Sequence, residues 1–151
     1  MNILNLCCNI ILECPHGWID AKHVNLGCLY FEKDKSMPWN DAKNYCENLE
    51  YENSHLVEIY DSTQQKFLKE MLLNFDNSFV WLIGLTDSEI EGTWKWAFSG
   101  NVSTYLPWGI DEPNGGVQEN CATLDFRVKD GWTDYTCFID YNMHPICQFN
   151  F

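Results

Sequence analysis

The chain has 151 residues, 46% hydrophobic and 15% aromatic, which is enough for one globular domain with a sizeable core. Nine basic and 22 acidic residues give a net charge of −13, so we expect no nucleic-acid binding and no membrane insertion, both of which favour positive surfaces. Surplus carboxylates instead suit a hard cation such as calcium, which prefers oxygen ligands.

The eight cysteines predict disulfides and hence a secreted, extracellular protein, because their number is even and no CxxC spacing occurs. The stretch 1–13 is a poor signal peptide, interrupted by asparagines and lacking an early basic residue; we expect a leader remnant or an N-terminal extension. The sequon at Asn101 offers a glycosylation acceptor.

The first half of the chain predicts one strand and two helices. The apolar run 27–31 is typical of a strand. A helix is expected to open near Pro38 with Ser36 as its cap, since apolar residues then recur at helical spacing as far as Leu49. A second helix should begin at a capping box, residues 62–65.

The second half predicts mainly strands and one long loop. The apolar run 80–85 suits a buried strand, and residues 94–96 alternate like a strand with one covered face. Residues 99–120 are rich in Gly, Pro, Asn and Asp, and a loop of that length is usually functional. Further short strands are expected at 121–126, 131–133 and 143–148. With the helices first and most strands later, this order predicts an α+β fold.

Oxygen donors gather at the end of that loop and shortly after it. Glu112 and Asn114 flank a proline, and a cis bond there would turn both side chains the same way. Glu119 and Asp134 follow. Carboxylate and amide oxygens are what calcium selects, so the group favours a calcium site over a plain solvated loop.

From Cys14 to about Gln148, the chain resembles the C-type lectin domain family in the order and spacing of several short segments. The segments that carry the resemblance are CPHGW (14–18), VWLIGL (80–85), EGTWKW (91–96), Glu-Pro-Asn (112–114), WTD (132–134) and the paired cysteines. The resemblance implies a disulfide-stapled α+β fold with two helices, small antiparallel sheets and a long calcium- and sugar-binding loop. The domain would cover 14–148, followed by a tail at 149–151.

The resemblance also implies a pairing for six cysteines: Cys14 with Cys28, Cys46 with Cys147, and Cys121 with Cys137. Cys7 and Cys8 lie outside that pattern. They either pair between chains or belong to a leader that is removed. An oligomer would therefore form through these two cysteines or through the domain surface.

In the family, Glu-Pro-Asn implies calcium-dependent binding of mannose-, fucose- and N-acetylglucosamine-type sugars. Glu112, Asn114, Glu119 and Asp134 would hold Ca²⁺ and, together with Thr133, would contact the sugar. Two neighbouring sugar hydroxyls would replace water on the ion, with carboxylates accepting and the amide donating hydrogen bonds. The expectation is a non-catalytic lectin that binds glycans or glycoproteins, with a role in innate immunity.

Thr133 departs from the family pattern, which usually has Asn there. A hydroxyl cannot place a carbonyl and an amide donor together, so we expect weaker calcium affinity or an altered choice of sugar. Thr133 also keeps an alternative open: a calcium-independent, protein-binding or structural domain of the same fold.

A second calcium position of the family would use Asp87, Glu91 and Glu119. Its other usual acids are replaced by Gly115 and Asn120. We therefore expect this second position to stay empty, with Asp87 and Glu91 in a solvated loop.

The remaining polar and aromatic residues receive structural interpretations. Surface charge is expected at Asp111, Asp125, Asp130 and Asp140, although Asp125 could help to shape the site. The neighbours Asp111 and Glu112 lie on one loop and do not by themselves flank a scissile bond, so we expect no enzyme. Core packing is expected for Trp81, Trp94, Trp96 and Trp132.

Overall fold

The computed structural model describes residues 13–125 and 131–151. Cys7, Cys8 and Asp130, and the end of the strand expected at 121–126, lie outside these residues. The elements in chain order are β1 (Ile19–Asp20), β2 (Cys28–Phe31), α1 (Trp39–Glu47), β3 (His55–Leu56), α2 (Ser62–Leu72), β4 (Val80–Thr86), β5 (Lys95–Trp96), β6 (Cys121–Leu124), β7 (Trp132–Tyr135) and β8 (Met143–Phe149), with short 3-10 helices at Lys22–Val24 and Gly116–Gln118.

The strands follow the order β1-β2-β8-β4-β6-β7, with β3 added to β8 and β5 added to β4. Most neighbours are antiparallel, as expected, but β4 and β8 run parallel, with Val80 opposite Met143. A parallel pair needs a long crossover connection, and β5, β6, β7 and the long loop supply it. The parallel β4–β8 pair is an exception to the otherwise antiparallel strand pairing that was expected.

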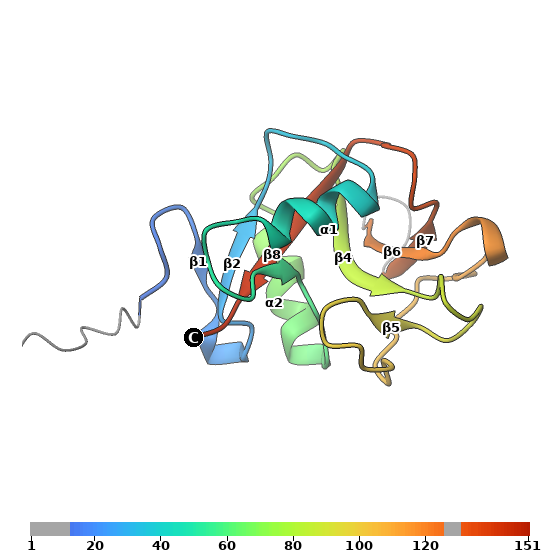
Figure 1. Cartoon of the computed structure of the whole chain (residues 1–151), viewed down its shortest axis with the longest axis horizontal. Coiled ribbons are helices and arrows are strands. Elements are labelled where there is room, and N and C mark those ends of the chain that lie inside the picture. The colour runs from blue at the N-terminus through green and yellow to red at the C-terminus, as the bar shows by residue number, and fades with distance from the viewer. Residues whose placement is uncertain (1–12, 126–130) are drawn as a thin grey trace, which may run out of the picture.

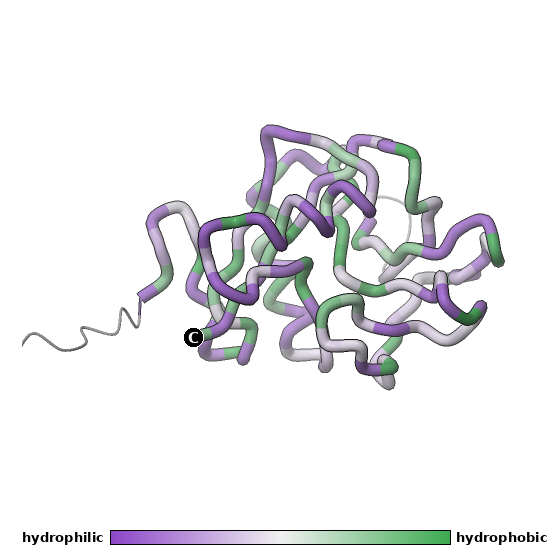
Figure 2. The backbone as a smooth tube through the Cα atoms, in the orientation of Figure 1, coloured by the Kyte–Doolittle hydropathy of each residue, from purple (hydrophilic) through white to green (hydrophobic). Residues whose placement is uncertain are grey.

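The apolar run of β4 is buried on both faces of the sheet. Trp81, Ile83 and Leu85 belong to the hydrophobic core that includes Leu68 of α2. Val80 and Leu82, which alternate with them, pack in the core that includes Ala42 of α1. Figure 1 shows β8 running between the two helices, and Figure 2 shows the hydrophobic stretch of β4 in the middle of the molecule.

Helix α1 begins where the sequence predicts, but without its predicted cap. Pro38 occupies the N-cap position and makes no side-chain cap hydrogen bond. The Ser36 hydroxyl instead donates to the Asp140 carboxylate, 2.7 Å away. The predicted Ser36 cap is wrong, because this side chain ties the approach to α1 to the segment before β8.

Helix α2 is capped one residue earlier than predicted. Asp61 is the N-cap, and its carboxylate accepts the Gln64 backbone N–H at 2.9 Å. Gln65, the partner expected for a capping box with Ser62, is buried, and its Oε1 accepts the indole N–H of Trp132 at 2.9 Å. Tertiary burial therefore displaces the local motif, and α2 is joined to β7.

Three disulfides join distant parts of the fold, in the pairing implied by the family resemblance: Cys14–Cys28, Cys46–Cys147 and Cys121–Cys137. Strand β8 continues through Phe149, which is 5% exposed, so this residue belongs to the sheet and not to the expected tail. Among residues 13–125 and 131–151, no helix is long and apolar enough to span a bilayer.

Candidate functional site

The long loop and strands β6 and β7 enclose a hollow of about 230 Å³, here called the acidic hollow. Its lining includes all five residues predicted for calcium or sugar contact. The complete lining is Glu112, Asn114, Glu119, Asp125, Thr133, Asp134 and Tyr135. Residues separated by more than twenty positions are thus brought to one place.

Glu112 and Asn114 face each other across Pro113. The Glu112–Pro113 bond is cis, and the Asn114 amide nitrogen donates to Glu112 Oε1 at 3.0 Å. The two side chains therefore turn to the same side of the loop, as the sequence predicted.

Asp134 ties the loop to strand β7. Its two carboxylate oxygens accept the backbone N–H groups of Asn114, at 3.0 Å, and Gly115, at 2.9 Å. Asp134 is itself fixed by the β6–β7 pairing, where it lies opposite Ala122. Hydrogen bonds to a carboxylate are stronger than neutral ones, so this contact positions Asn114 above the hollow.

Thr133 is turned into the sheet. It lies opposite Thr123 in the β6–β7 register, and the two hydroxyls are 2.7 Å apart. Thr133 is 6% exposed, and Thr123 is fully buried. The hydroxyl that replaces the family's usual amide is therefore engaged with another side chain of the protein.

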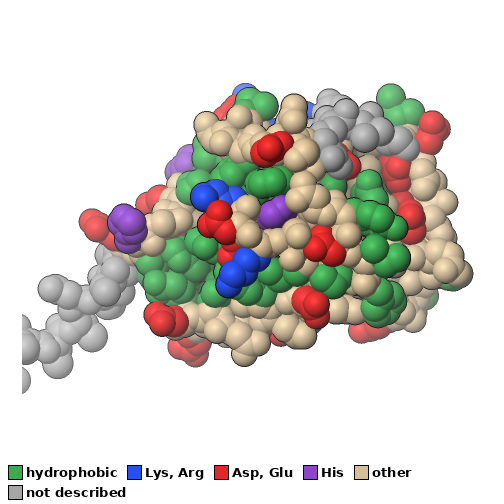
Figure 3. Space-filling model, turned by 90° about the horizontal axis from the view of Figure 1, so that it is seen from above, with side chains coloured by type: hydrophobic (Ala, Val, Ile, Leu, Met, Phe, Trp, Pro, Cys, Tyr) green, Lys and Arg blue, Asp and Glu red, His purple; other side chains and the backbone are tan. Residues whose placement is uncertain are grey.

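The carboxylates of the acidic hollow disfavour one another's charge. Burial raises the pKa of Glu119, and the neighbouring charges of Asp134 and Glu112 raise it further. Burial likewise raises the pKa of Glu91, with Asp87 and Asp134 adding to the effect. Figure 3 shows acidic side chains over one face of the molecule, where few basic ones accompany them. A bound cation would relieve this repulsion.

The residues of the second calcium position are also close to this loop. Asp87 is 3% exposed, and its Oδ2 accepts the Gly92 N–H at 2.8 Å. Within the part of the chain that the structure describes, the buried Oδ1 atoms of Asp87 and Asn120 have no hydrogen-bond partner. A side chain at position 115 would meet Glu119, because a Cβ on Gly115 would lie 2.3 Å from Glu119 Cβ. Asp87 is therefore a buried group and not the solvated one expected, while the vacancy of this position stays a prediction.

Asp125 is the lining residue that the sequence placed mainly at the surface. It is 1% exposed, and the Tyr135 hydroxyl donates to its Oδ2 at 3.4 Å. Alternation along the strand expected at 121–126 could have found it, because positions 121, 123 and 125 would share one face, although the observed strand ends at Leu124. Asp111 and Asp140, in contrast, are exposed, as expected for surface charge.

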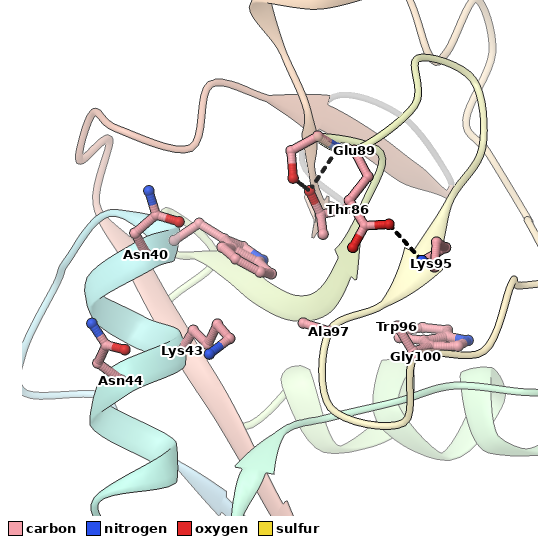
Figure 4. A pocket seen from close by; sticks show the side chains of 11 residues that line it. Asn40, Lys43, Asn44, Thr86, Glu89, Lys95, Trp96, Ala97 and Gly100 are labelled. Atoms are coloured by element: carbon pink, nitrogen blue, oxygen red, sulfur yellow. Dashed lines mark hydrogen bonds and ion pairs between the residues drawn. The ribbon is translucent and has the colours of Figure 1, made fainter.

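A second hollow, of about 470 Å³, lies between α1 and the β4–β5 segment (Figure 4). Lysines enter it from both sides, and both are paired within the protein. Lys95 contacts Glu89 at 2.5 Å, and Lys43 contacts Glu47 at 2.8 Å. Its charges are thus compensated internally, in contrast to those of the acidic hollow.

The donor set of the acidic hollow fits calcium by its chemistry, since it consists of carboxylate and amide oxygens. Among residues 13–125 and 131–151, however, no three Asp, Glu, His or Cys side chains converge closely enough to hold a metal ion as they stand. One reason why the side chains do not converge is that the Asp134 carboxylate is engaged with the loop backbone. Ion binding would require these oxygens to exchange or share their present partners.

The remaining expectations concern packing and modification. The four tryptophans assigned to the core are each at most 4% exposed: Trp81, Trp94, Trp96 and Trp132. Asn101 is exposed at the sequon.

Comparison with known proteins gives consistent matches. The family model of the lectin C-type domain matches residues 35–149. A relative from Nomascus concolor, "C-type lectin domain family 4 member M", is 31% identical over 137 residues, which cover 89% of this chain and 30% of that protein. The chain thus spans less than a third of that relative's length.

Solved structures share the fold. The carbohydrate-recognition domain of the mouse scavenger receptor C-type lectin has a TM-score of 0.75 and 30% identity, with 91% of this chain and 98% of that chain covered. A calcium-independent type II antifreeze protein has a TM-score of 0.74 and 25% identity, with 92% of this chain and 95% of that chain covered. The same scaffold therefore occurs in proteins with different ligands.

Proposed function

This chain belongs to the C-type lectin domain family, whose domains generally bind carbohydrate, and we propose that it binds sugars in a calcium-dependent manner at the acidic hollow. One observation carries the proposal: Glu112, Asn114, Glu119 and Asp134 line one hollow. The raised pKa of Glu119 supports it, since burial and the charges of Asp134 and Glu112 disfavour the Glu119 carboxylate and a cation would favour it.

Each residue would have a distinct role. Glu112, Asn114, Glu119 and Asp134 would hold Ca²⁺, which when bound supplies a positive centre that attracts two neighbouring sugar hydroxyls. The carboxylates accept hydrogen bonds from those hydroxyls, and the Asn114 amide donates one. The Glu-Pro-Asn order favours mannose-, fucose- and N-acetylglucosamine-type sugars.

The setting we propose is a secreted, non-catalytic lectin that binds glycans or glycoproteins, with a role in innate immunity. The three disulfides suit an oxidising, extracellular compartment. Cys7, Cys8 or the domain surface would supply the contacts of an oligomer, which would raise avidity for multivalent glycans. Asn101, exposed at its sequon, would accept a glycan.

A second candidate function is a calcium-independent, protein-binding or structural role. The observation that favours it is the contact of the Thr133 hydroxyl with Thr123, because a hydroxyl that is already engaged is a weaker calcium ligand and sugar contact than the amide usual in the family. A calcium-independent relative of this fold exists, the antifreeze protein described above.

Retention on immobilised mannose tests the proposal. We expect the chain to bind mannose-agarose in millimolar calcium and to elute with a chelator. Calorimetry separates the two candidates, because a calcium-binding domain gives heat on titration and melts at a higher temperature with the ion. Binding to no glycan on an array in millimolar calcium would contradict the lectin function, and no calcium heat would favour the second candidate.

A further inference from the structure

A third hollow lies at the opposite end of the molecule from the long loop, where the end of α1 meets β2 (Figure 1). Its volume is about 260 Å³. Four of its six lining residues are aromatic: Trp18, Tyr30, Tyr45 and Tyr51. The other two are Leu49 and Glu50. We call it the aromatic hollow.

The aromatic rings form an angled wall. Trp18 and Tyr51 have ring centroids 5.1 Å apart and planes at 80°, and Trp18 and Tyr30 lie 5.4 Å apart at 38°. Phe149 of β8 stacks on Tyr51 at 4.7 Å with nearly parallel planes. The Cys14–Cys28 disulfide holds the segment before Trp18 against β2. The wall is therefore built on ordered strands and a covalent link.

The hydroxyl of Tyr45 is engaged with the protein, which leaves its ring as wall. It donates to Glu32, whose other carboxylate oxygen accepts the backbone N–H groups of Asp34 and Lys35. The Lys35 ammonium lies 6.0 Å from the centroid of the Tyr45 ring. One ring of this hollow thus already attracts a cation of the protein itself.

Two opposite charges lie at the hollow: the Glu50 carboxylate in its lining and the Lys35 ammonium near the Tyr45 ring. Glu50, an exposed residue, is the one charged side chain among the six that line it. The whole chain carries a net charge of −13, so anionic ligands are disfavoured here. Besides the Glu50 carboxylate, the polar groups of the lining are the indole N–H of Trp18 and the tyrosine hydroxyls, each carried on an aromatic ring, in contrast to the carboxylates and amide of the acidic hollow.

We propose that the aromatic hollow binds a quaternary ammonium group, such as the head of choline or the side chain of trimethyllysine. Aromatic faces attract such cations through their negative π-surface, and methylated nitrogen needs no hydrogen-bond partner. The Glu50 carboxylate adds favourable charge at the rim. This binding site is independent of the acidic hollow and would work without calcium.

A titration followed by NMR tests this site on the full chain in the presence of a chelator. The probes are choline chloride, a trimethyllysine peptide and 3,3-dimethylbutan-1-ol, a neutral molecule with the shape of choline. We expect the indole N–H of Trp18 to shift with the cations, with an affinity about tenfold higher for choline than for its neutral analogue. If both cations bind, the site recognises the quaternary ammonium group that they share. If only one binds, that molecule is the source of the ligand.

Matched variants separate this site from general surface charge. Glu50→Gln should weaken choline binding about threefold or more, because it removes the rim charge without changing the fold. Glu52→Gln, which changes an exposed acid outside the lining, should have no effect. Equal binding of choline and its neutral analogue, equal effects of the two variants, or no shift at all would overturn the proposal. Displacement of the same Trp18 signal by mannose would instead assign the hollow to sugar.

Discussion

Different interactions stabilise two regions of the molecule. One region is the scaffold, formed by the two helices with strands β1–β4 and β8, and the other is the acidic hollow. In this scaffold, buried apolar side chains and a disulfide between α1 and β8 determine the geometry. In the hollow, hydrogen bonds to Asp134 hold the loop, and neighbouring carboxylates raise the pKa of Glu119. We therefore expect substitutions in the scaffold to act mainly on stability, and substitutions in the hollow to act mainly on the ligand binding proposed above.

The largest effect is expected from removing the bridge that closes the scaffold. The Cys46→Ser/Cys147→Ser double variant opens a link that spans 101 residues, and the chain-entropy model sets its loss of unfolding free energy at about 4.7 kcal/mol at most. Urea denaturation measures it. The Cys14→Ser/Cys28→Ser variant, whose bridge spans 14 residues, should lose about 3 kcal/mol. A larger loss for the shorter bridge would contradict this ranking.

The second-largest effect is expected on calcium affinity, with a much smaller effect on the stability of the scaffold. Asp134→Asn changes a proposed calcium ligand and removes one charged acceptor of the loop N–H groups, so calcium affinity should fall more than about tenfold, as judged by calorimetry. Asp111→Asn is the matched control, because it removes the same charge from an exposed residue that does not line the hollow. Similar losses in both variants would show that only the overall charge of the loop matters.

A third, smaller effect would sharpen the assignment of Thr133. Thr133→Asn restores an amide ligand, and we expect calcium affinity to rise severalfold, although loss of the contact with Thr123 should lower stability by about 1 kcal/mol. Thr123→Val breaks the same contact without adding a ligand. It should therefore reproduce the loss of stability and leave calcium affinity unchanged; a gain of affinity in Thr123→Val would refute the ligand argument.

The smallest effect concerns pH and belongs to the scaffold. His55 is 5% exposed, stacks on Phe98 at 3.9 Å, and has a pKa lowered mainly by burial. Because the folded state favours the neutral ring, its contribution to stability is complete above the ordinary histidine pKa and is lost as the pH falls through the lowered value. His55→Gln should flatten the dependence of unfolding free energy on pH between about 7 and 5. If the pH dependence of the unfolding free energy is unchanged in His55→Gln, other titratable groups cause it.

The sequence predicts the long elements of the scaffold because their patterns are strong. The apolar run of β4 extends over six residues, and the helical spacing of α1 and α2 extends over nine and eleven. Strands β1 and β3 have two residues each, too few to show any period, and they form by pairing with β2 and β8. The parallel pairing of β4 with β8 depends on contacts between distant segments and has no local signature.

The candidate site could be predicted as a set of residues but not as a geometry. The order of Glu112, Asn114, Glu119 and Asp134 brings them to one hollow, as the family resemblance implies. The direction of the Thr133 hydroxyl depends on its cross-strand neighbour Thr123, which no linear motif contains. The burial of Asp125 differs, because alternation along the strand expected at 121–126 could have indicated it.

Strand β8 has a consequence for how the protein is made. All seven of its residues are buried, and it pairs with β2, β3 and β4, so the sheet stays incomplete until Met143–Phe149 has left the ribosome. Cys14 and Cys28 can meet early in synthesis, whereas Cys46 must wait for Cys147 with its thiol unpaired. We therefore expect the nascent domain to need protection from incorrect cysteine pairing during synthesis, and formation of the Cys46–Cys147 disulfide to finish only after the last strand is inserted.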